Sequence, residues 1–153
     1  MSTTFNNNIN NNIDELSKIR EKFFNFLLKK PCTSGGAVEY LSRNGVPENF
    51  FDLLLTEAAN MKLIDDAAYA KLFIDGHLTW GNAKIIYELS SRGVSHEEIN
   101  EALDECEDES FRASELAQSW RKVGIDERKI INRLLSRGFS HRSARASSVD
   151  KNN

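Results

Sequence analysis

The chain has 153 residues, of which 40% are hydrophobic and 28% are charged, and its formal net charge is −3. With 8 glycines and 2 prolines it is not a collagen, and no segment approaches the ~20 consecutive apolar residues that span a bilayer. Two cysteines, Cys32 and Cys106, cannot form a disulfide framework, and the first residues do not resemble a secretion signal. We therefore expect a cytoplasmic protein with free thiols, long enough for one or two domains or a short array of repeats.

The two ends of the chain are polar. Residues 1–12 contain an Asn-rich run that has neither helical nor strand periodicity. Asparagine competes with helix formation by bonding to the nearby backbone, so we predict a disordered Asn-rich tail over residues 1–12. The other end is predicted to be frayed from about Ser147.

Between these ends the hydrophobic pattern is helical nearly throughout. Apolar residues recur at i, i+3, i+4 and i+7, as in the set Ile99, Ala102, Leu103 and Cys106. No run of alternating β-branched residues indicates a strand. Ser95 and Glu98 form a capping box, and Thr79 is placed to cap a helix that begins at Trp80. The pattern predicts an all-α fold of short amphipathic helices.

Three glycines mark an internal repeat. Gly45, Gly93 and Gly138 recur at intervals of 48 and 45 residues, and each is followed by an apolar residue and then by Pro or Ser. Each glycine is placed to end a helix in the left-handed conformation. Because such a period is typical of helical arrays, we predict three tandem three-helix, helix-turn-helix-like repeats that form an elongated, curved array. Their predicted bounds are 13–60, 61–107 and 108–149.

The middle repeat is predicted to be the best packed. Trp80 and Trp120 could stack on nucleic-acid bases, but their helical spacing with alanines favours core positions. The expected core of the middle repeat is Tyr69, Leu72, Phe73, Trp80, Ile86, Leu89, Ile99 and Leu103.

No group of residues indicates catalysis or metal binding. The three histidines are scattered, without a second ligand at i+3 or i+4. Asp65 and Asp66 could be an acid or metal pair, but adjacent carboxylates before an apolar helix are more often caps. No glycine-rich loop follows a strand, and no serine or cysteine has the setting of a nucleophile. We therefore expect no enzymatic activity, no metal and no cofactor.

The charge is distributed unevenly along the chain. Residues 1–110 hold 10 Lys and Arg against 19 Asp and Glu, a net charge of −9, whereas residues 111–153 hold 10 against 4, a net charge of +6. Lys129, Arg133 and Arg137 lie four residues apart and share one face of a predicted helix. Such a face can contact phosphates or an acidic protein, and the alternative is a solvated surface without a partner. The candidate partner-binding or DNA-binding residues are Arg121, Lys122, Arg128, Lys129, Arg133, Arg137, Arg142 and Arg145.

Three motifs accompany the repeat. The first motif is Leu63-Ile64-Asp65-Asp66 followed by Tyr69-Ala70. The second is Trp80-Gly81 followed by Leu89 and Arg92-Gly93. The third is Arg137-Gly138-Phe139-Ser140. In order and spacing these motifs resemble the RecX family of regulatory proteins, and the resemblance extends over residues 20–145. The first repeat departs from the family pattern. Family members usually carry a basic-basic-x-x-Ser/Thr-x-x-Glu-Leu stretch there, whereas this chain has residues 29–38, in which Gly35 and Gly36 weaken the start of the helix.

The resemblance implies a non-enzymatic regulator of the RecA recombinase. Members of the RecX family lie in the helical groove of the RecA–DNA filament and lower strand exchange, ATP turnover and co-protease activity, which places them in DNA repair, recombination and the SOS response. A chain of small repeats suits this task because it can contact several filament subunits at once. The implied partners are the RecA filament and DNA, directly or through the filament; we expect a monomer and no membrane partner.

A second interpretation is a tandem helix-turn-helix protein that binds DNA directly. The two interpretations differ in the partner that the protein needs. The regulator requires the RecA filament, whereas naked duplex DNA suffices for the tandem helix-turn-helix protein. The sequence pI of ≈ 5.7 favours the regulator, because a dedicated DNA-binding protein usually carries a basic excess.

Overall fold

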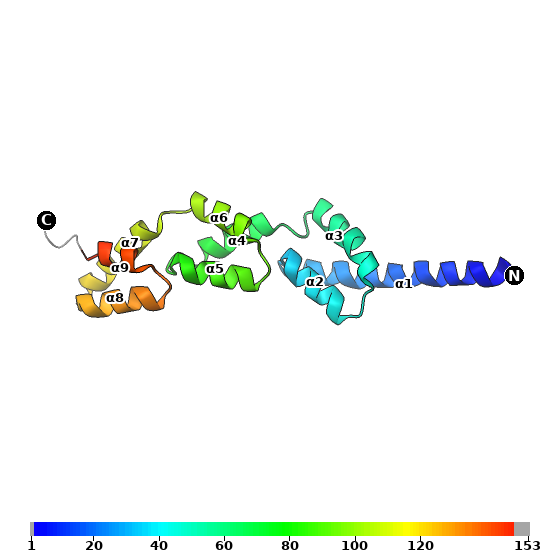
Figure 1. Ribbon diagram of the computed structural model, residues 1–153, viewed down its shortest axis with the longest axis horizontal. Coiled ribbons are helices and arrows are strands. Elements are labelled where there is room, and N and C mark those ends of the chain that lie inside the picture. The colour runs from blue at the N-terminus through cyan, green and yellow to red at the C-terminus, as the bar shows by residue number, and fades with distance from the viewer. Residues whose placement is uncertain (1, 149–153) are drawn as a thin grey trace. The chain divides into compact units, whose positions relative to one another are not determined.

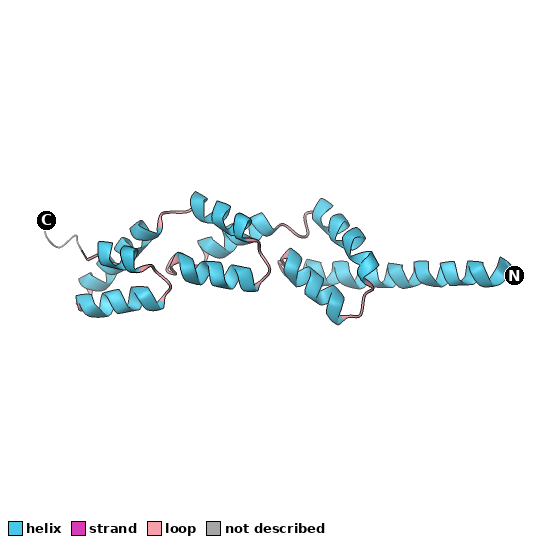
Figure 2. Cartoon of the chain, viewed as in Figure 1, coloured by secondary structure: helices cyan, strands magenta, loops and turns pink. Residues whose placement is uncertain are grey.

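The computed structural model describes residues 2–148, with side chains from residue 11 onward, and within that range it is helical without a strand (Figures 1 and 2). This confirms the predicted all-α class. Among the same residues, no helix combines the length and apolar character needed to cross a membrane. The helices are α1 (Ser2–Lys29), α2 (Ser34–Arg43), the 3-10 turn η1 (Glu48–Phe50), α3 (Phe51–Asn60), α4 (Asp66–Asp75), α5 (Asn82–Ser91), α6 (His96–Glu105), α7 (Glu109–Lys122), α8 (Glu127–Ser136) and α9 (His141–Ala146).

The chain forms two compact units, unit 1 (Met1–Asp66) and unit 2 (Ala67–Asn153). Unit 1 contains one hydrophobic core, built by α1, α2 and α3. Unit 2 contains two, one built by α4, α5 and α6 and the other by α7, α8 and α9. Each core is thus made by three consecutive helices, as the repeat predicts. The elongated, curved arrangement of the array stays a prediction.

The Asn-rich segment is part of a helix, and the predicted disordered tail is wrong for residues 2–12 because α1 begins at Ser2. The free-energy cost of forming the first turn of a helix arises only once. In α1 that cost is offset where Phe23 and Leu27 pack into the first core. Extending it through asparagines then costs a few tenths of a kcal/mol per residue, roughly 0.7 at most, since asparagine is a poor helix former but not a helix breaker.

The first core extends past the predicted boundary at residue 60. Ile64 packs with this core, and Cys32 pairs with Ile64 in a single parallel bridge. The Asp66 carboxylate accepts a hydrogen bond from the Ser34 amide at 2.7 Å, so it satisfies an amide at the start of α2. The Thr33 hydroxyl accepts from the Gly36 amide at 3.0 Å and satisfies a second amide of the same turn. The repeat bounds 13–60, 61–107 and 108–149 stay predictions, with Ile64 placed in the first core.

The core of the middle repeat agrees with the prediction at most positions. Phe73, Leu89 and Ile99 are buried, and the other expected members except one pack against them partly buried. Leu72 was expected in the core, but it is 68% exposed. The inward stripe of α4 is Ala70, Phe73 and Ile74, which leaves position 72 on the opposite side of the helix. The buried residues that the prediction omits are Ala70, Ile74, Ile85, Val94 and Ala102.

The predicted helix ends are mostly confirmed. Gly45, Gly93 and Gly138 have φ of 69°, 86° and 91°, the left-handed conformation that the repeat requires. The Ser95 hydroxyl accepts from the Glu98 amide at 3.3 Å, as the capping box predicts. Thr79 is not a cap, because α5 begins two residues later than expected and follows Gly81.

The C-terminal end is ordered further than predicted. Ser147, where fraying was expected to begin, is fully buried. Its carbonyl accepts a hydrogen bond from the Arg121 guanidinium, which ties the end of α9 to α7. The last residue of the predicted third repeat, Val149, lies outside the described residues.

Candidate interaction surface

Most of the predicted basic residues are exposed on the third repeat, at the end of α7 and on α8 and α9. Ile130 and Leu134 fill the buried side of α8, which directs Lys129 and Arg133 to solvent as predicted. Arg121 and Arg137 are half-buried. We call the remaining exposed candidates together with Arg137 the basic surface: Lys122, Arg128, Lys129, Arg133, Arg137, Arg142 and Arg145.

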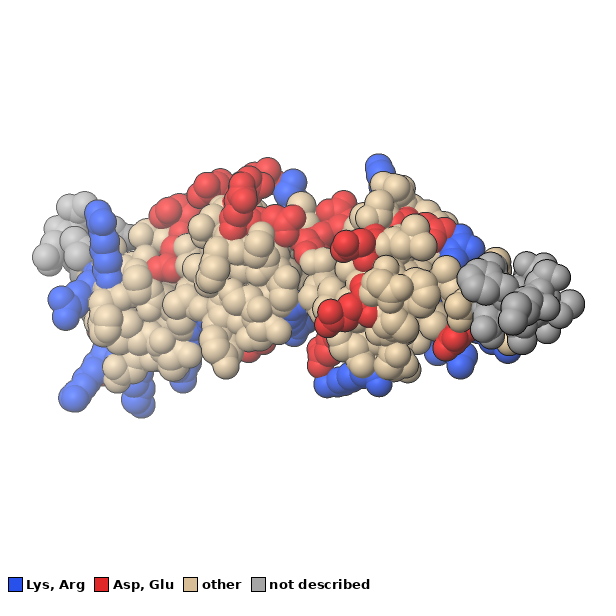
Figure 3. Space-filling model, turned by 45° about the vertical axis from the view of Figure 1, so that its right-hand side comes forward, with Lys and Arg blue, Asp and Glu red and all other residues tan. Residues whose placement is uncertain are grey.

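The charges of unit 2 are segregated. In Figure 3, Lys and Arg gather over the third repeat, whereas Asp and Glu cover the neighbourhood of α6. The segment from Glu97 to Glu109 holds eight Asp and Glu and no Lys or Arg. Unit 2 therefore presents one basic and one acidic region, which gives it a preferred orientation toward a charged partner.

Two arginines of the basic surface are held over one aromatic ring. The guanidinium carbons of Arg133 and Arg137 lie 5.5 Å and 5.2 Å from the centroid of Trp120. Trp120 in turn packs partly buried against the third core. Cation–π attraction thus restricts both side chains, so that less side-chain entropy is lost when they bind a partner.

Arg121 has an internal role. Its guanidinium pairs with Glu127, the first residue of α8, and donates to the Ser147 carbonyl. Both side chains of the pair are 21% exposed. Arg121 therefore fastens α7 to the start of α8 and to the end of α9, and we leave it out of the basic surface for this reason.

The second and third repeats are connected by a buried arginine that sequence reasoning missed. Arg112 of α7 is 3% exposed, and its Nε donates to the Glu107 carbonyl at 3.0 Å. Its two Nη groups donate to the carbonyls of Leu78 and Trp80 and to the Asn82 side chain. A buried guanidinium needs such partners, and here most of them come from the loop between α4 and α5 and from the start of α5.

Glu109 completes this connection. Its carboxylate accepts from the Asn82 amide at 2.8 Å and from the Ser140 amide at 3.0 Å, at the starts of α5 and α9. Burial raises the pKa of Glu109, but these amide hydrogen bonds outweigh it, and the pKa lies below its ordinary value. One carboxylate therefore satisfies the N-terminal amides of two helices from two repeats.

The backbones of the two repeats also bond directly. The Gly81 amide donates to the Arg137 carbonyl at 2.9 Å, and the Ala83 amide donates to the Gly138 carbonyl at 3.3 Å. A Cβ on Gly81 would lie 2.1 Å from the Gly138 carbonyl carbon, so only glycine fits there. We call the contacts of Gly81, Glu109, Arg112 and Gly138 the joint. The Trp80-Gly81 and Arg137-Gly138 motifs were its sequence signals, but neither showed that the two meet, because hydrophobic periodicity does not report contacts between backbones.

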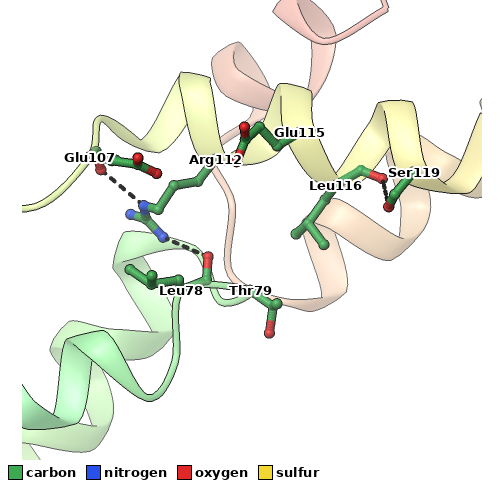
Figure 4. Close-up of a pocket in the computed structure, with 7 residues that line it drawn as sticks. All are labelled: Leu78, Thr79, Glu107, Arg112, Glu115, Leu116 and Ser119. Atoms are coloured by element: carbon green, nitrogen blue, oxygen red, sulfur yellow. Dashed lines mark hydrogen bonds between the residues drawn. The ribbon is translucent and has the colours of Figure 1, made fainter.

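A shallow pocket of ≈ 200 Å³ adjoins the joint (Figure 4). Arg112 reaches from α7 toward the Leu78 carbonyl on one side of it, and Leu116 and Ser119 lie on the other. The Arg112 guanidinium that borders this pocket already bonds to protein groups.

The remaining chemistry-bearing groups are the acidic residues, the histidines and the two cysteines. Within residues 11–148, no cluster of three or more His, Cys, Asp and Glu side chains could hold a metal ion. Burial raises the pKa of the Cys32 and Cys106 thiols, which favours their protonated form. Both sulfhydryls donate to backbone carbonyls, Cys32 to Thr33 and Cys106 to Leu103.

Comparison with known proteins places this arrangement in a family. Residues 65–103, which hold α4, α5 and most of α6, match the family model of the second three-helix domain of RecX. Regulatory protein RecX of Lactobacillus delbrueckii subsp. bulgaricus is 30% identical over 137 residues, which cover 82% of this chain and 50% of that protein. Regulatory protein RecX of Clostridium botulinum (strain Alaska E43) is 30% identical over 141 residues, covering 85% of this chain and 66% of that protein. The chain belongs to the RecX family.

The RecX fold is shared with a solved structure. The crystal structure of RecX from Lactobacillus salivarius superposes with a TM-score of 0.79 at 20% sequence identity, covering 92% of this chain and 98% of that one. At this identity the likeness shows the fold alone. The chain spans about half the length of the first RecX relatives it matches, 50% of the Lactobacillus delbrueckii protein.

Proposed function

We propose that this RecX-family chain is a non-enzymatic, cytoplasmic regulator that binds the RecA–DNA filament through the basic surface of unit 2 and mostly inhibits its recombinase, ATPase and co-protease activities. The observation that carries the proposal is the basic surface itself. Six exposed Lys and Arg, with Arg133 and Arg137 held over Trp120, stand in a chain whose net charge is −3. A basic surface on an acidic protein favours a composite partner over naked DNA.

The partner is tested by co-sedimentation of the full chain with RecA filaments assembled on single-stranded DNA, with RecA alone and with duplex DNA alone. We expect binding to the filament at salt concentrations where duplex DNA alone no longer binds. Equal binding to naked duplex DNA, with a steep loss as salt rises, would instead support the tandem helix-turn-helix interpretation.

The surface is tested by two charge-reversed pairs. Lys129→Glu with Arg133→Glu should weaken filament binding strongly, because both side chains are exposed and four residues apart on α8. Each substitution should change the free energy of unfolding by only about 0.5 kcal/mol, with up to about 1 kcal/mol for the loss of the Arg133–Trp120 contact.

The matched control uses the acidic region. Glu97→Lys with Glu101→Lys reverses two exposed charges at the same spacing on α6, and this variant should bind the filament as well as the unmodified chain or better. If both double variants inhibit RecA equally, the basic surface is not the binding site.

A further inference from the structure

Helices α8 and α5 are arranged head to tail across the joint (Figure 1). The carbonyls of Arg137 and Gly138, which directly follow α8, accept hydrogen bonds from the amides of Gly81 and Ala83 at the start of α5. These amides are among those that a helix leaves without internal partners. A Cβ on Gly138 would lie 2.5 Å from the Lys84 Cβ. The backbone of Lys84 therefore borders the residue that follows Arg137.

Lys84 is held in the same way as the arginines of the third repeat. Its ammonium lies 4.2 Å from the centroid of the Trp80 ring, as the guanidiniums of Arg133 and Arg137 lie over Trp120. It is the one Lys or Arg on α5, and it stands at the end of that helix that meets α8. Thus a cation restricted by a tryptophan occurs on each side of the joint.

The spacing of these cations suits a linear polyanion. Lys129, Arg133 and Arg137 follow one another every four residues, which is about 6 Å along a helix. The backbone of Lys84 borders Gly138, the residue after Arg137. The phosphates of a nucleic-acid strand form a regular line of charge, whereas the carboxylates of an acidic protein surface have no such regularity. Guanidinium groups also match phosphate in a bidentate geometry.

We infer that Lys84, Lys129, Arg133 and Arg137 form one surface that crosses the joint and binds the phosphate backbone of nucleic acid. Arg112 and Glu109 are positioning residues for this surface. The inference rests on the proposed function and makes it more specific. Arg112 and Glu109 are buried or half-buried and point into the joint. Their effect on binding is to keep Lys84 in register with Arg137.

The first test is the binding of RecA filaments, assembled on single-stranded DNA, to the full chain between 50 and 200 mM salt. Lys84→Ala should reduce the slope of log affinity against log salt by about one, as expected for one lost phosphate contact. Lys84→Glu should weaken binding on the order of tenfold. The control is Lys71→Glu, which changes the charge equally in the same repeat but on α4, where Lys71 pairs with Glu105 at 2.7 Å; it should bind like the unmodified chain.

The second test asks whether the joint matters. In a Glu109→Gln background, and separately in Arg112→Lys, Lys84→Ala should have a smaller effect on affinity than in the intact chain, because Lys84 is no longer held beside Arg137. Circular dichroism shows whether the Glu109→Gln and Arg112→Lys chains fold. If one of them does not fold, the effect of Lys84→Ala is measured in the other. Strictly additive effects in a folded background would overturn the positioning role.

The outcomes separate this inference from the proposed function. If the Lys84 variants bind with the affinity and salt slope of the unmodified chain while the Lys129/Arg133 pair loses binding, the proposed function stands and the inference is overturned. If the Lys84 variants bind more weakly but with an unchanged salt slope, Lys84 contacts RecA protein and not phosphate, and the inference is also overturned. If the unmodified chain does not bind filaments, the proposed function fails and the inference fails with it.

Discussion

The cores of unit 2 and the joint between them are held by different forces. The second core consists of apolar side chains such as Ile85, Leu89 and Ile99, which are stabilised by removal from water. The joint consists of a buried guanidinium, a carboxylate and two glycine backbones, and its stability depends on hydrogen bonds with specific partners. A core tolerates changes of side chain that keep its volume, whereas the joint depends on particular atoms.

The largest expected effect is at the closest backbone contact of the joint. Gly81→Ala places a Cβ 2.1 Å from the Gly138 carbonyl carbon, so the repeats must separate, and we expect unit 2 to lose about 3 kcal/mol of unfolding free energy. Urea unfolding followed by tryptophan fluorescence measures this loss, because both tryptophans of the chain, Trp80 and Trp120, lie in unit 2.

Gly76→Ala is the matched control for this substitution. The nearest atoms to a Cβ there are backbone oxygens at 3.6 Å, an ordinary contact, so the change should be within about 0.5 kcal/mol. Equal effects of the two substitutions would show that the joint is as tolerant as a surface turn.

The next effect is the loss of the buried guanidinium. Arg112→Met keeps the unbranched apolar stem of the side chain but leaves the Leu78 and Trp80 carbonyls and the Asn82 amide oxygen without this donor, so we expect a destabilisation of about 2 kcal/mol. The same measurement applied to Arg142→Met, at an exposed position on α9, should give a change within about 0.5 kcal/mol. If Arg112→Met proves neutral, the joint is held by apolar contacts like the cores.

The smallest effect concerns pH. The pKa of Glu109 is lowered in the folded chain, so the ionised carboxylate stabilises the folded state. This contribution to the free energy of unfolding is complete above the ordinary glutamate pKa of 4.5, and it is lost as the pH falls through the lower pKa of the folded chain. Glu109→Gln should cost about 1 kcal/mol at neutral pH, and the gap to the unmodified chain should narrow in acid. Unfolding free energies measured from pH 7 to pH 3 test this, and a gap that stays constant over that range would contradict it.

Local patterns determined the repeat. The glycines at 45, 93 and 138 end helices through their own backbone conformation, and Ser95 caps the helix that follows it within three residues. The exposure of Lys129 and Arg133 follows from the apolar stripe of the same helix. Such features need no information from distant parts of the chain, and the sequence alone was sufficient for them.

The sequence-based errors occur where a local preference competes with packing. Asparagine disfavours helix, yet residues 2–12 extend a helix whose buried part is further along the chain. Leu72 is apolar but lies outside the stripe of α4 that faces the second core. In both cases the tertiary contacts of neighbouring residues set the outcome.

Sequence by itself determined that this chain is an all-α array of three-helix repeats with a basic C-terminal part. Only the tertiary structure decided how the second and third repeats are joined and which basic residues lie together. Arg112 bonds to Asn82 across 30 positions, and Lys84 borders Gly138 across an even longer stretch of the chain. Hydrophobic periodicity reports the face that a helix buries, but a buried polar contact is fixed by the positions of two partners, and these are known only once the chain has folded.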